Sequence, residues 1–186
     1  MAIPIVLLGY GTVGRALALE ALALGDELRF LAVLDSSGGV VDPSGIPAGR
    51  LREILALKEK GEGLGAAGLA WEEALEAVRA LLREGRGVLV DATASEGTVG
   101  FLLEALEQGW GVVLANKRPL VGPWEDYRRL TSSGRLRYEA TVGAGLPVIA
   151  VLESLLATGD EVYRIRGILS GTLGFLLHRV EEGIPF

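Results

Sequence analysis

The sequence predicts an α/β fold: a doubly wound parallel sheet, followed by the beginning of a second α+β domain. Three observations carry this prediction. Short apolar runs alternate with helix-forming segments, the first run enters a glycine-rich turn, and polar residues follow most of the runs. Short apolar strands separated by helices are typical of a parallel sheet that is covered on both faces.

The first strand, turn and helix carry the clearest motif. An apolar run over 3–8 leads into the turn 9–14, which has the spacing G-x-G-x-x-G, and a helix-forming segment over 15–22 follows. A second apolar run over 30–34 ends at Asp35. This order is typical of a Rossmann-like dinucleotide-binding domain. The alternative is a glycine-rich turn that binds nothing.

The three glycines of the turn have different expected roles. Gly9 makes the tight turn, Gly11 lets the backbone approach a pyrophosphate, and Gly14 lets the helix pack closely on the strand. The pyrophosphate would lie at the helix N-terminus, where free N–H groups and the helix dipole favour negative charge.

The remaining elements of this domain follow in alternation. After Asp35 the stretch 36–39 and a proline-containing loop lead to the first of several helices. We expect helices over 48–60 and 71–84 joined by a glycine-rich linker over 61–68, strands over 88–90, 112–114 and 136–140, and helices over 98–108 and 123–133.

Polar clusters follow several of the predicted strands. They are the residues 91–95, the pair Asn116-Lys117 and the residues 139–141. Because the carboxyl ends of parallel strands meet at one edge, we expect these clusters to converge there with the glycine-rich turn. Each cluster taken alone could also be an ordinary turn or helix cap.

The last forty or so residues do not continue the regular alternation of strands and helices. The run 143–147 opens a helix over 147–157 that is apolar nearly all round, which favours burial between layers or domains. A strand over 162–169 and a final helix to about residue 182 follow. One strand and one helix make no independent core. We therefore predict a dinucleotide-binding domain over 1–145 and the start of an incomplete substrate or dimerisation domain over 146–186.

Composition narrows the function classes. The chain has 186 residues, a net charge of −6 and no cysteine, which excludes disulfides and thiolate metal sites. The acidic balance argues against a nucleic-acid partner. The N-terminus has no signal-peptide pattern and no membrane span, so we expect a cytoplasmic protein. Of the three lysines, Lys58 and Lys60 lie in a charged helical stretch and are expected to be solvated, unlike Lys117.

Five segments together resemble homoserine dehydrogenase. They are 9–14, 91–95 (DATAS), 115–117 (ANK), 138–147 (YEATVGAGLP) and 167–172 (GILSGT). The first is weakly specific and the fourth is highly specific. The resemblance implies an oxidoreductase that interconverts L-homoserine and L-aspartate 4-semialdehyde with NAD or NADP. This step leads toward threonine, methionine and isoleucine. The family also implies a homodimer.

The resemblance assigns roles to matching positions. Tyr10, Thr12, Val13, Thr93 and Lys117 would line the cofactor, Lys117 would also face the reaction centre as the catalytic residue, and Thr172 would lie near the substrate. The residues themselves agree on one point: a lysine at a strand end beside this turn can neutralise a phosphate or polarise a carbonyl. A solvated surface lysine is the alternative.

The resemblance also implies a monovalent cation, usually sodium. Its ligands would be the Glu139 carboxylate and the backbone carbonyls of Val142, Ala144 and Leu146. Hard cations take oxygen ligands, and a glycine-rich turn can point several carbonyls inward. The alternative is a rigid connection that holds only water.

Two departures from the family pattern affect the substrate side. Gly174 stands where the family often has a polar residue. The family's substrate-holding carboxylates and its proton-handling lysine would lie beyond Phe186, and His178 is no substitute because it is expected in mid-helix. A nucleotide-binding module without turnover and a related dehydrogenase of another small amino-acid aldehyde are therefore alternatives.

The cofactor preference rests on one acidic residue. Asp35 would accept hydrogen bonds from the ribose hydroxyls of NAD and repel a 2′-phosphate, which favours NAD. Ser36 and Ser37 could soften this preference, and the family often uses NADP as well.

Overall fold

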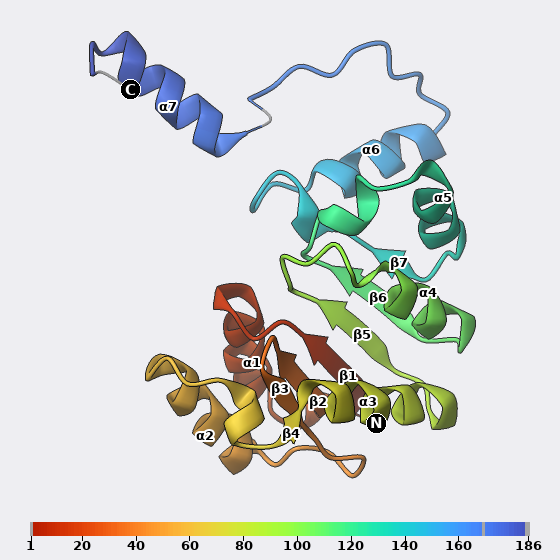
Figure 1. Ribbon diagram of the computed structural model, residues 1–186. Helices are drawn as coiled ribbons and strands as arrows, with labels where there is room; N and C mark the ends of the chain where they lie inside the picture. The colour runs from red at the N-terminus through yellow and green to blue at the C-terminus, as the bar shows by residue number, and fades with distance from the viewer. Residues whose placement is uncertain (1, 169, 185–186) are drawn as a thin grey trace. The chain divides into compact units, whose positions relative to one another are not determined.

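A seven-stranded sheet with the order β4-β3-β2-β1-β5-β6-β7 organises most of the chain. The computed structural model describes residues 2–168 and 170–184. It separates into two units, Met1–Val142, which holds the sheet, and Gly143–Phe186 (Figure 1). The strands are β1 Ile3–Leu8, β2 Leu28–Asp35, β3 Gly38–Val41, β4 Leu69–Ala70, β5 Val88–Asp91, β6 Gly111–Leu114 and β7 Leu136–Arg137.

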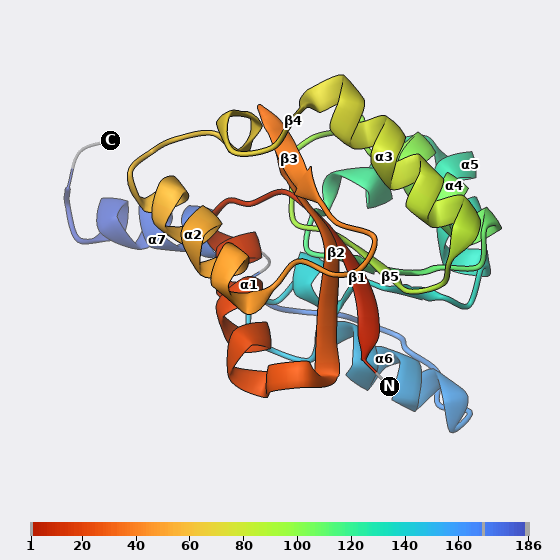
Figure 2. The same cartoon turned by 90° about the horizontal axis from the view of Figure 1, so that it is seen from below.

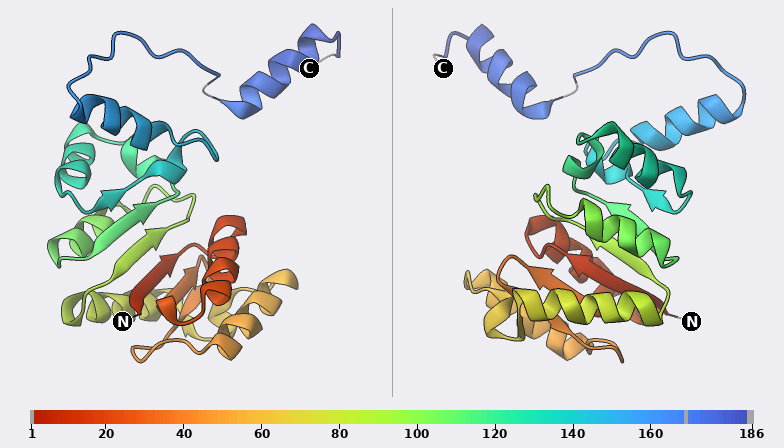
Figure 3. Two further views of the ribbon diagram at one scale, coloured as in Figure 1. Left: turned by 180° about the vertical axis from the view of Figure 1, so that it is seen from behind. Right: turned by 45° about the vertical axis from the view of Figure 1, so that its right-hand side comes forward.

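Helices cover both faces of the sheet in the first unit. They are α1 Thr12–Leu24, α2 Ala48–Glu59, α3 Trp71–Glu84, α4 Val99–Glu107 and α5 Trp124–Ser132. In the view from below, α1 and α2 lie on one side of the strands and α3, α4 and α5 on the other (Figure 2). Figure 3 shows the same layers from two further directions. The doubly wound α/β class predicted from the sequence is confirmed.

Strand alternation explains why both faces are covered. Along β1, Ile5 and Leu7 belong to the core beneath α1 and α2, whereas Val6 and Leu8 belong to the core beneath α3 and α4. A strand buried on both faces must be apolar throughout, and this is why β1 reads as a continuous apolar run.

The sheet is mixed, which corrects the prediction of a parallel sheet. β2 pairs antiparallel with β3, and β3 pairs antiparallel with β4. The sequence predicts no strand between Asp35 and residue 48, but Gly38 and Gly39 begin β3. A Cβ atom on Gly39 would lie 2.8 Å from the Val33 carbonyl oxygen, so close packing on β2 requires glycine in a strand.

Two strand predictions near the C-terminus are wrong. The strand expected over 136–140 ends at Arg137, because β7 pairs only with β6, through Val112 and Val113. Residues 162–168 are not a strand, and Leu169 lies outside the described residues. A strand needs a neighbour for its backbone groups, and the described part of the second unit provides none.

The second unit contains α6 Val148–Ala157 and α7 Gly171–Glu181. Neither helix has a buried residue, so the predicted burial of the apolar helix is not seen. The division after Val142 comes from the pattern of contacts, and the domain boundary at residue 145 stays a prediction. Across the described residues, the helices are too short or too polar to cross a membrane.

Trp110 provides a test of the core beneath α3 and α4. Its indole is fully buried and donates a hydrogen bond to the Leu82 carbonyl at 3.0 Å. We expect Trp110→Phe to lower the free energy of unfolding by about 1–3 kcal/mol, because it removes this hydrogen bond and leaves a small void. Urea unfolding measures the change. The control Trp124→Phe, at a side chain that is 70% exposed, should stay within about 0.5 kcal/mol of the parent chain.

Candidate functional site

The candidate site is a pocket of about 640 Å³ at the carboxyl edge of the sheet. It lies where the chain, having built β2 on one side of β1, returns to build β5 on the other side. Ligands of doubly wound sheets bind at this switch point. The lining residues are Gly9, Tyr10, Gly11, Asp35, Ser36, Lys58, Trp71, Ala92, Thr93, Ala94 and Ser95.

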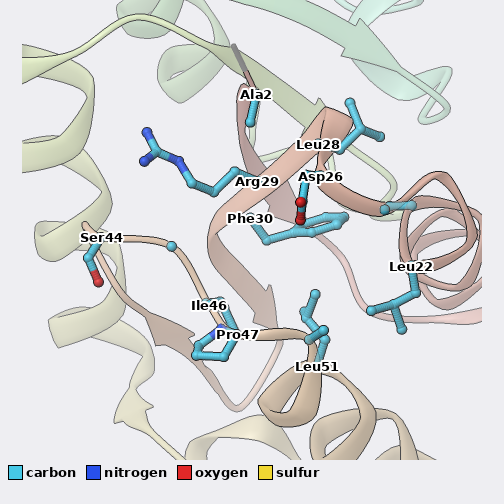
Figure 4. Close-up of a pocket in the computed structure, with 14 residues that line it drawn as sticks. Ala2, Leu22, Asp26, Leu28, Arg29, Phe30, Ser44, Ile46, Pro47 and Leu51 are labelled. Atoms are coloured by element: carbon cyan, nitrogen blue, oxygen red, sulfur yellow. The ribbon is translucent and has the colours of Figure 1, made fainter.

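A second pocket of about 410 Å³ lies at the opposite edge, between the start of β2 and the start of α2 (Figure 4). Its polar side chains include Asp26, Arg29 and Ser44. Neither the glycine-rich turn nor any of the strand-end clusters reaches it. We therefore take the pocket at the carboxyl edge as the site.

The glycine-rich turn is tightly packed on one side and open on the other. Gly9 has a φ of 92°, and a Cβ atom there would lie 2.6 Å from the backbone of Ala92 and Thr93. A Cβ atom on Gly14 would lie 2.0 Å from the Gly9 carbonyl oxygen. At Gly11, by contrast, a Cβ atom would meet nothing within 4 Å. The protein thus fills the space at two glycines and leaves it free at the third.

Helix α1 begins directly after this open glycine. Gly11 is its N-cap, and no side chain caps the first turn. The first backbone N–H groups of a helix have no partner within the helix. Thr12 and Val13, predicted to line the cofactor, are exposed in this first turn. Together these groups form an anion-binding end beside the free space at Gly11.

Tyr10 lies at the pocket, as expected, but its side chain is mostly covered. It is only 1% exposed and packs in the core beneath α1 and α2. Burial raises the pKa of its hydroxyl to about 12, against a smaller opposite effect of Arg15. Its side chain therefore belongs to the core and supports the turn from below.

Asp35 ends β2 with both carboxylate oxygens engaged. Oδ1 accepts hydrogen bonds from the Ser37 backbone N–H at 2.8 Å and from the Ser37 hydroxyl at 2.6 Å. Oδ2 accepts from the Lys58 ammonium at 2.7 Å and from the Leu64 N–H at 3.1 Å. A carboxylate offers about four acceptor positions, so these donors use its capacity. The predicted contact with a ribose would have to displace one of them.

Lys58 is the basic group of this pocket, and the expectation that it is solvated is wrong. Its side chain is 21% exposed and forms the ion pair with Asp35. Desolvation opposes ionisation of Asp35, but the hydrogen bonds from Lys58, Ser37 and Leu64 outweigh it and lower the pKa of the carboxyl. The pair places an ammonium group at the end of β2.

Asp91 organises the other side of the pocket. It is fully buried at the end of β5. Oδ1 accepts from the N–H and the hydroxyl of Thr93 at 2.9 and 2.7 Å, and Oδ2 accepts from the Thr98 hydroxyl at 2.8 Å and the Asn116 amide at 3.1 Å. The same amide donates to the Ser95 carbonyl at 2.7 Å. The loop 92–95 is thereby fastened to the end of β6.

Lys117 follows Asn116 at this edge. Its backbone precedes a short 3₁₀ turn, Arg118–Leu120, and the Asn116 carbonyl oxygen Oδ1 accepts from the Arg118 N–H at 3.1 Å. The Lys117 side chain is exposed and does not line the pocket. The structure therefore fixes the backbone of the predicted catalytic lysine beside the loop 92–95.

Comparisons with known proteins support one family. The family described as Homoserine dehydrogenase matches residues 147–186, and the family described as Glutamate/Leucine/Phenylalanine/Valine dehydrogenase matches residues 3–84. The chloroplastic bifunctional aspartokinase/homoserine dehydrogenase of Daucus carota is 36% identical over 86% of this chain. Homoserine dehydrogenase of Saccharomyces cerevisiae is 39% identical over 49% of it. A hyperthermophilic archaeal homoserine dehydrogenase in complex with NADPH covers 84% of it, with a TM-score of 0.66 and 30% identity.

The chain belongs to the homoserine dehydrogenase family. It spans 50% of the archaeal chain, 26% of the yeast protein and 17% of the carrot protein. The match to the glutamate-type dehydrogenases falls on β1 to α3, which hold the weakly specific glycine-rich turn, so it does not distinguish the families.

The positions predicted for a cation fall in both units of the chain. Glu139 and Val142 belong to the first unit, and Ala144 and Leu146 to the second. The Leu146 carbonyl accepts a hydrogen bond from the Val148 N–H at 2.9 Å. No cluster of three or more His, Asp or Glu side chains that could hold a metal is found among the described residues. Sodium binding stays a prediction.

The predicted substrate residue Thr172 lies exposed in the first turn of α7. Ser170 caps this helix by accepting from the Leu173 N–H at 3.2 Å. His178 is also exposed, with Nε2 3.6 Å from a Glu182 carboxylate oxygen. The contact of Thr172 with substrate stays a prediction.

Two lining residues escaped the sequence analysis, namely Lys58 and Trp71. Lys58 could have been proposed as a pocket residue, because a lysine that is not solvated often pairs with a carboxylate such as Asp35 at a strand end. Trp71 gave no local signal, because an aromatic residue at the start of an amphipathic helix normally packs in the core.

Asp35 gives a pH-dependent test of this site. We expect Asp35→Asn to lower the free energy of unfolding at pH 7 by about 2 kcal/mol, because it removes a charged acceptor from Lys58. Since the folded-state pKa is lowered, the contribution of the carboxylate is present above the unfolded value of about 3.9 and disappears as the pH falls through the folded value. The gap between variant and parent should therefore be constant at neutral pH and shrink as the pH falls below about 4.

Urea unfolding from pH 7 to pH 3 is the measurement. Asp42→Asn is the matched control. Asp42 accepts the same pair of hydrogen bonds from Ser44, at 2.9 and 2.6 Å, in an exposed turn, so this variant measures the effect of losing the serine hydrogen bonds without the partner Lys58. A gap for Asp35→Asn that is constant from pH 7 to pH 3 would contradict a role for the charge.

Proposed function

We propose that this chain holds NAD(P) for the interconversion of L-homoserine and L-aspartate 4-semialdehyde. The observation that carries the proposal is the open Gly11 beside the uncapped N-terminus of α1, at the switch point of the sheet. Backbone N–H groups there suit a pyrophosphate. A homoserine dehydrogenase that resembles the chain was solved with NADPH.

The chain's own residues would bind and orient the reactants. A bound nicotinamide supplies the hydride chemistry. The loop 92–95, fastened through Asp91 and Asn116, forms the wall of the pocket beyond the turn. Lys117, at the end of the neighbouring strand, would offer an ammonium to the oxygen of the reacting carbonyl or to a phosphate. Thr172 would contact the substrate.

Lys58 favours the use of NADP alongside NAD. Its ammonium lies on Asp35, at the strand end that normally meets the ribose of a dinucleotide. The carboxylate that would repel a 2′-phosphate is thereby neutralised and covered by a positive group. We therefore replace the expected preference for NAD with acceptance of both cofactors.

Three finer predictions belong to the same proposal. They are a cation on Glu139, Val142, Ala144 and Leu146, a homodimer, and a cytoplasmic location. The exposed apolar side chains of α6, such as Val151 and Leu156, support association. The test of the activity is formation of NAD(P)H with L-homoserine, by this chain and by a chain extended beyond Phe186, where the resemblance places the remaining substrate-binding residues. Cofactor binding without turnover by either chain selects the nucleotide-binding module, and turnover of another amino-acid aldehyde alone selects the related dehydrogenase.

Gly11 tests the pyrophosphate position. We expect Gly11→Val to abolish NADH and NADPH binding while the chain stays folded, because a Cβ atom there meets no protein atom and a branched side chain would occupy the ligand's space. Titration of cofactor fluorescence is the measurement, with circular dichroism as the folding check. The control is Gly122→Val, at another glycine with open space that lies outside the pocket. Undiminished binding by folded Gly11→Val would remove the basis of the proposal.

Lys58 tests the cofactor preference. We expect Lys58→Met to weaken NADPH about ten-fold more than NADH, on the order of 1.4 kcal/mol, because one charge–phosphate contact is lost. Lys60→Met is the matched control, since Lys60 is exposed and does not line the pocket. Equal losses for both cofactors would show that Lys58 does not meet the 2′ position.

A further inference from the structure

Trp71 is the element of the pocket that the proposed function leaves without a role. It lines the same cavity as Ser36, Lys58 and the loop 92–95. Its side chain is half-buried and packs against the core beneath α3 and α4. The indole packs against the core on one side and borders the cavity on the other. It therefore gives the cavity a rigid apolar surface.

The backbone of Trp71 is fixed by the sheet. Asp35 on β2 pairs with Gly38 on β3, and Gly38 pairs with Ala70 on β4, the residue directly before Trp71. A lateral row of paired residues thus connects the nucleotide end of β2 to the first residue of α3. The position of the indole therefore depends on regular strand pairing and not on a free loop.

The occupant that fits this surface is a flat heteroaromatic ring. Tyr10 is the other aromatic residue at the pocket, and its side chain is 1% exposed and belongs to the opposite core. Stacking on an indole needs no particular hydrogen-bond pattern from the ring. Lys58 and Ser36 lie at the ribose end of the same cavity, which leaves the base to the neighbouring wall.

We propose that Trp71 is the platform on which the adenine ring of the cofactor stacks. This inference rests on the proposed function, because it presumes that a dinucleotide occupies the pocket. It assigns the adenosine half of the cofactor to the wall formed by α3, and it makes Trp71 a binding residue and not only a part of the core.

The test uses the full chain and adenosine 5′-monophosphate, which carries the adenine but no nicotinamide. In a Trp124→Phe background the remaining indoles are Trp71 and the fully buried Trp110. We expect this nucleotide to quench and shift the indole emission. We expect Trp71→Leu to weaken both this nucleotide and NADH about ten-fold, and Trp71→Phe to retain most of the affinity. A purely structural Trp71 would not be quenched.

The outcomes separate the two proposals. If the parent chain binds neither NADH nor the monophosphate, both the proposed function and the platform fail. If the parent binds NADH and folded Trp71→Leu binds it equally well, the platform alone is overturned. Binding of the monophosphate without any change in emission also overturns the platform. Circular dichroism of both variants shows that they are folded, and Trp71→Phe serves as the conservative control should Trp71→Leu unfold.

Discussion

The close approach of the first turn to the end of β5 is the constraint on which the site depends. Gly9 has a φ of 92°, and no side chain fits between it and the backbone of Ala92 and Thr93. Gly14 is equally crowded by the carbonyl of Gly9. These two contacts bring α1, β1 and β5 together so closely that the crevice at the switch point is walled by backbone. A ligand there meets N–H groups directly, and this suits a phosphate.

The two strand-end carboxylates make the same local pattern of hydrogen bonds. Asp35 and Asp91 each accept, with one oxygen, from the N–H and the hydroxyl of the residue two positions ahead. This is the side-chain turn that Asp forms readily with a following Ser or Thr. The second oxygen of each carboxylate then reaches an element distant in sequence: Lys58 of α2 in one case, Asn116 beyond β6 in the other. Each Asp therefore stabilises the turn that follows it and also holds an element distant in the sequence.

Local sequence signals account for much of the fold and for part of the site. Apolar runs and helix-forming segments gave the core strands and the five helices of the first unit, because both depend on periodicity within a few residues. The strands β3 and β4 were not predicted. Packing on β2 demands a glycine in β3, where glycine gives no strand signal, and β4 has only two residues. The residues 162–168 were wrongly predicted as a strand, because an apolar run becomes a strand only with a pairing partner.

The same distinction explains the site. The roles of Gly9 and Gly14 follow from spacing alone, whereas the engagement of Asp35 follows from a lysine 23 positions away. The motif places Tyr10 at the pocket but says nothing of the face on which its ring lies, and the ring packs in the core. The hydrogen bonds that hold the loop 92–95 are also long-range: the Asn116 amide donates to the Asp91 carboxylate, the Thr93 hydroxyl and the Ser95 carbonyl. Since Lys117 is the next residue, the loop 92–95 that lines the proposed cofactor pocket and the lysine predicted to act on the substrate share one buried support. Under the proposed function, a change in that network would disturb the binding of cofactor and substrate together, because both depend on this stretch of backbone.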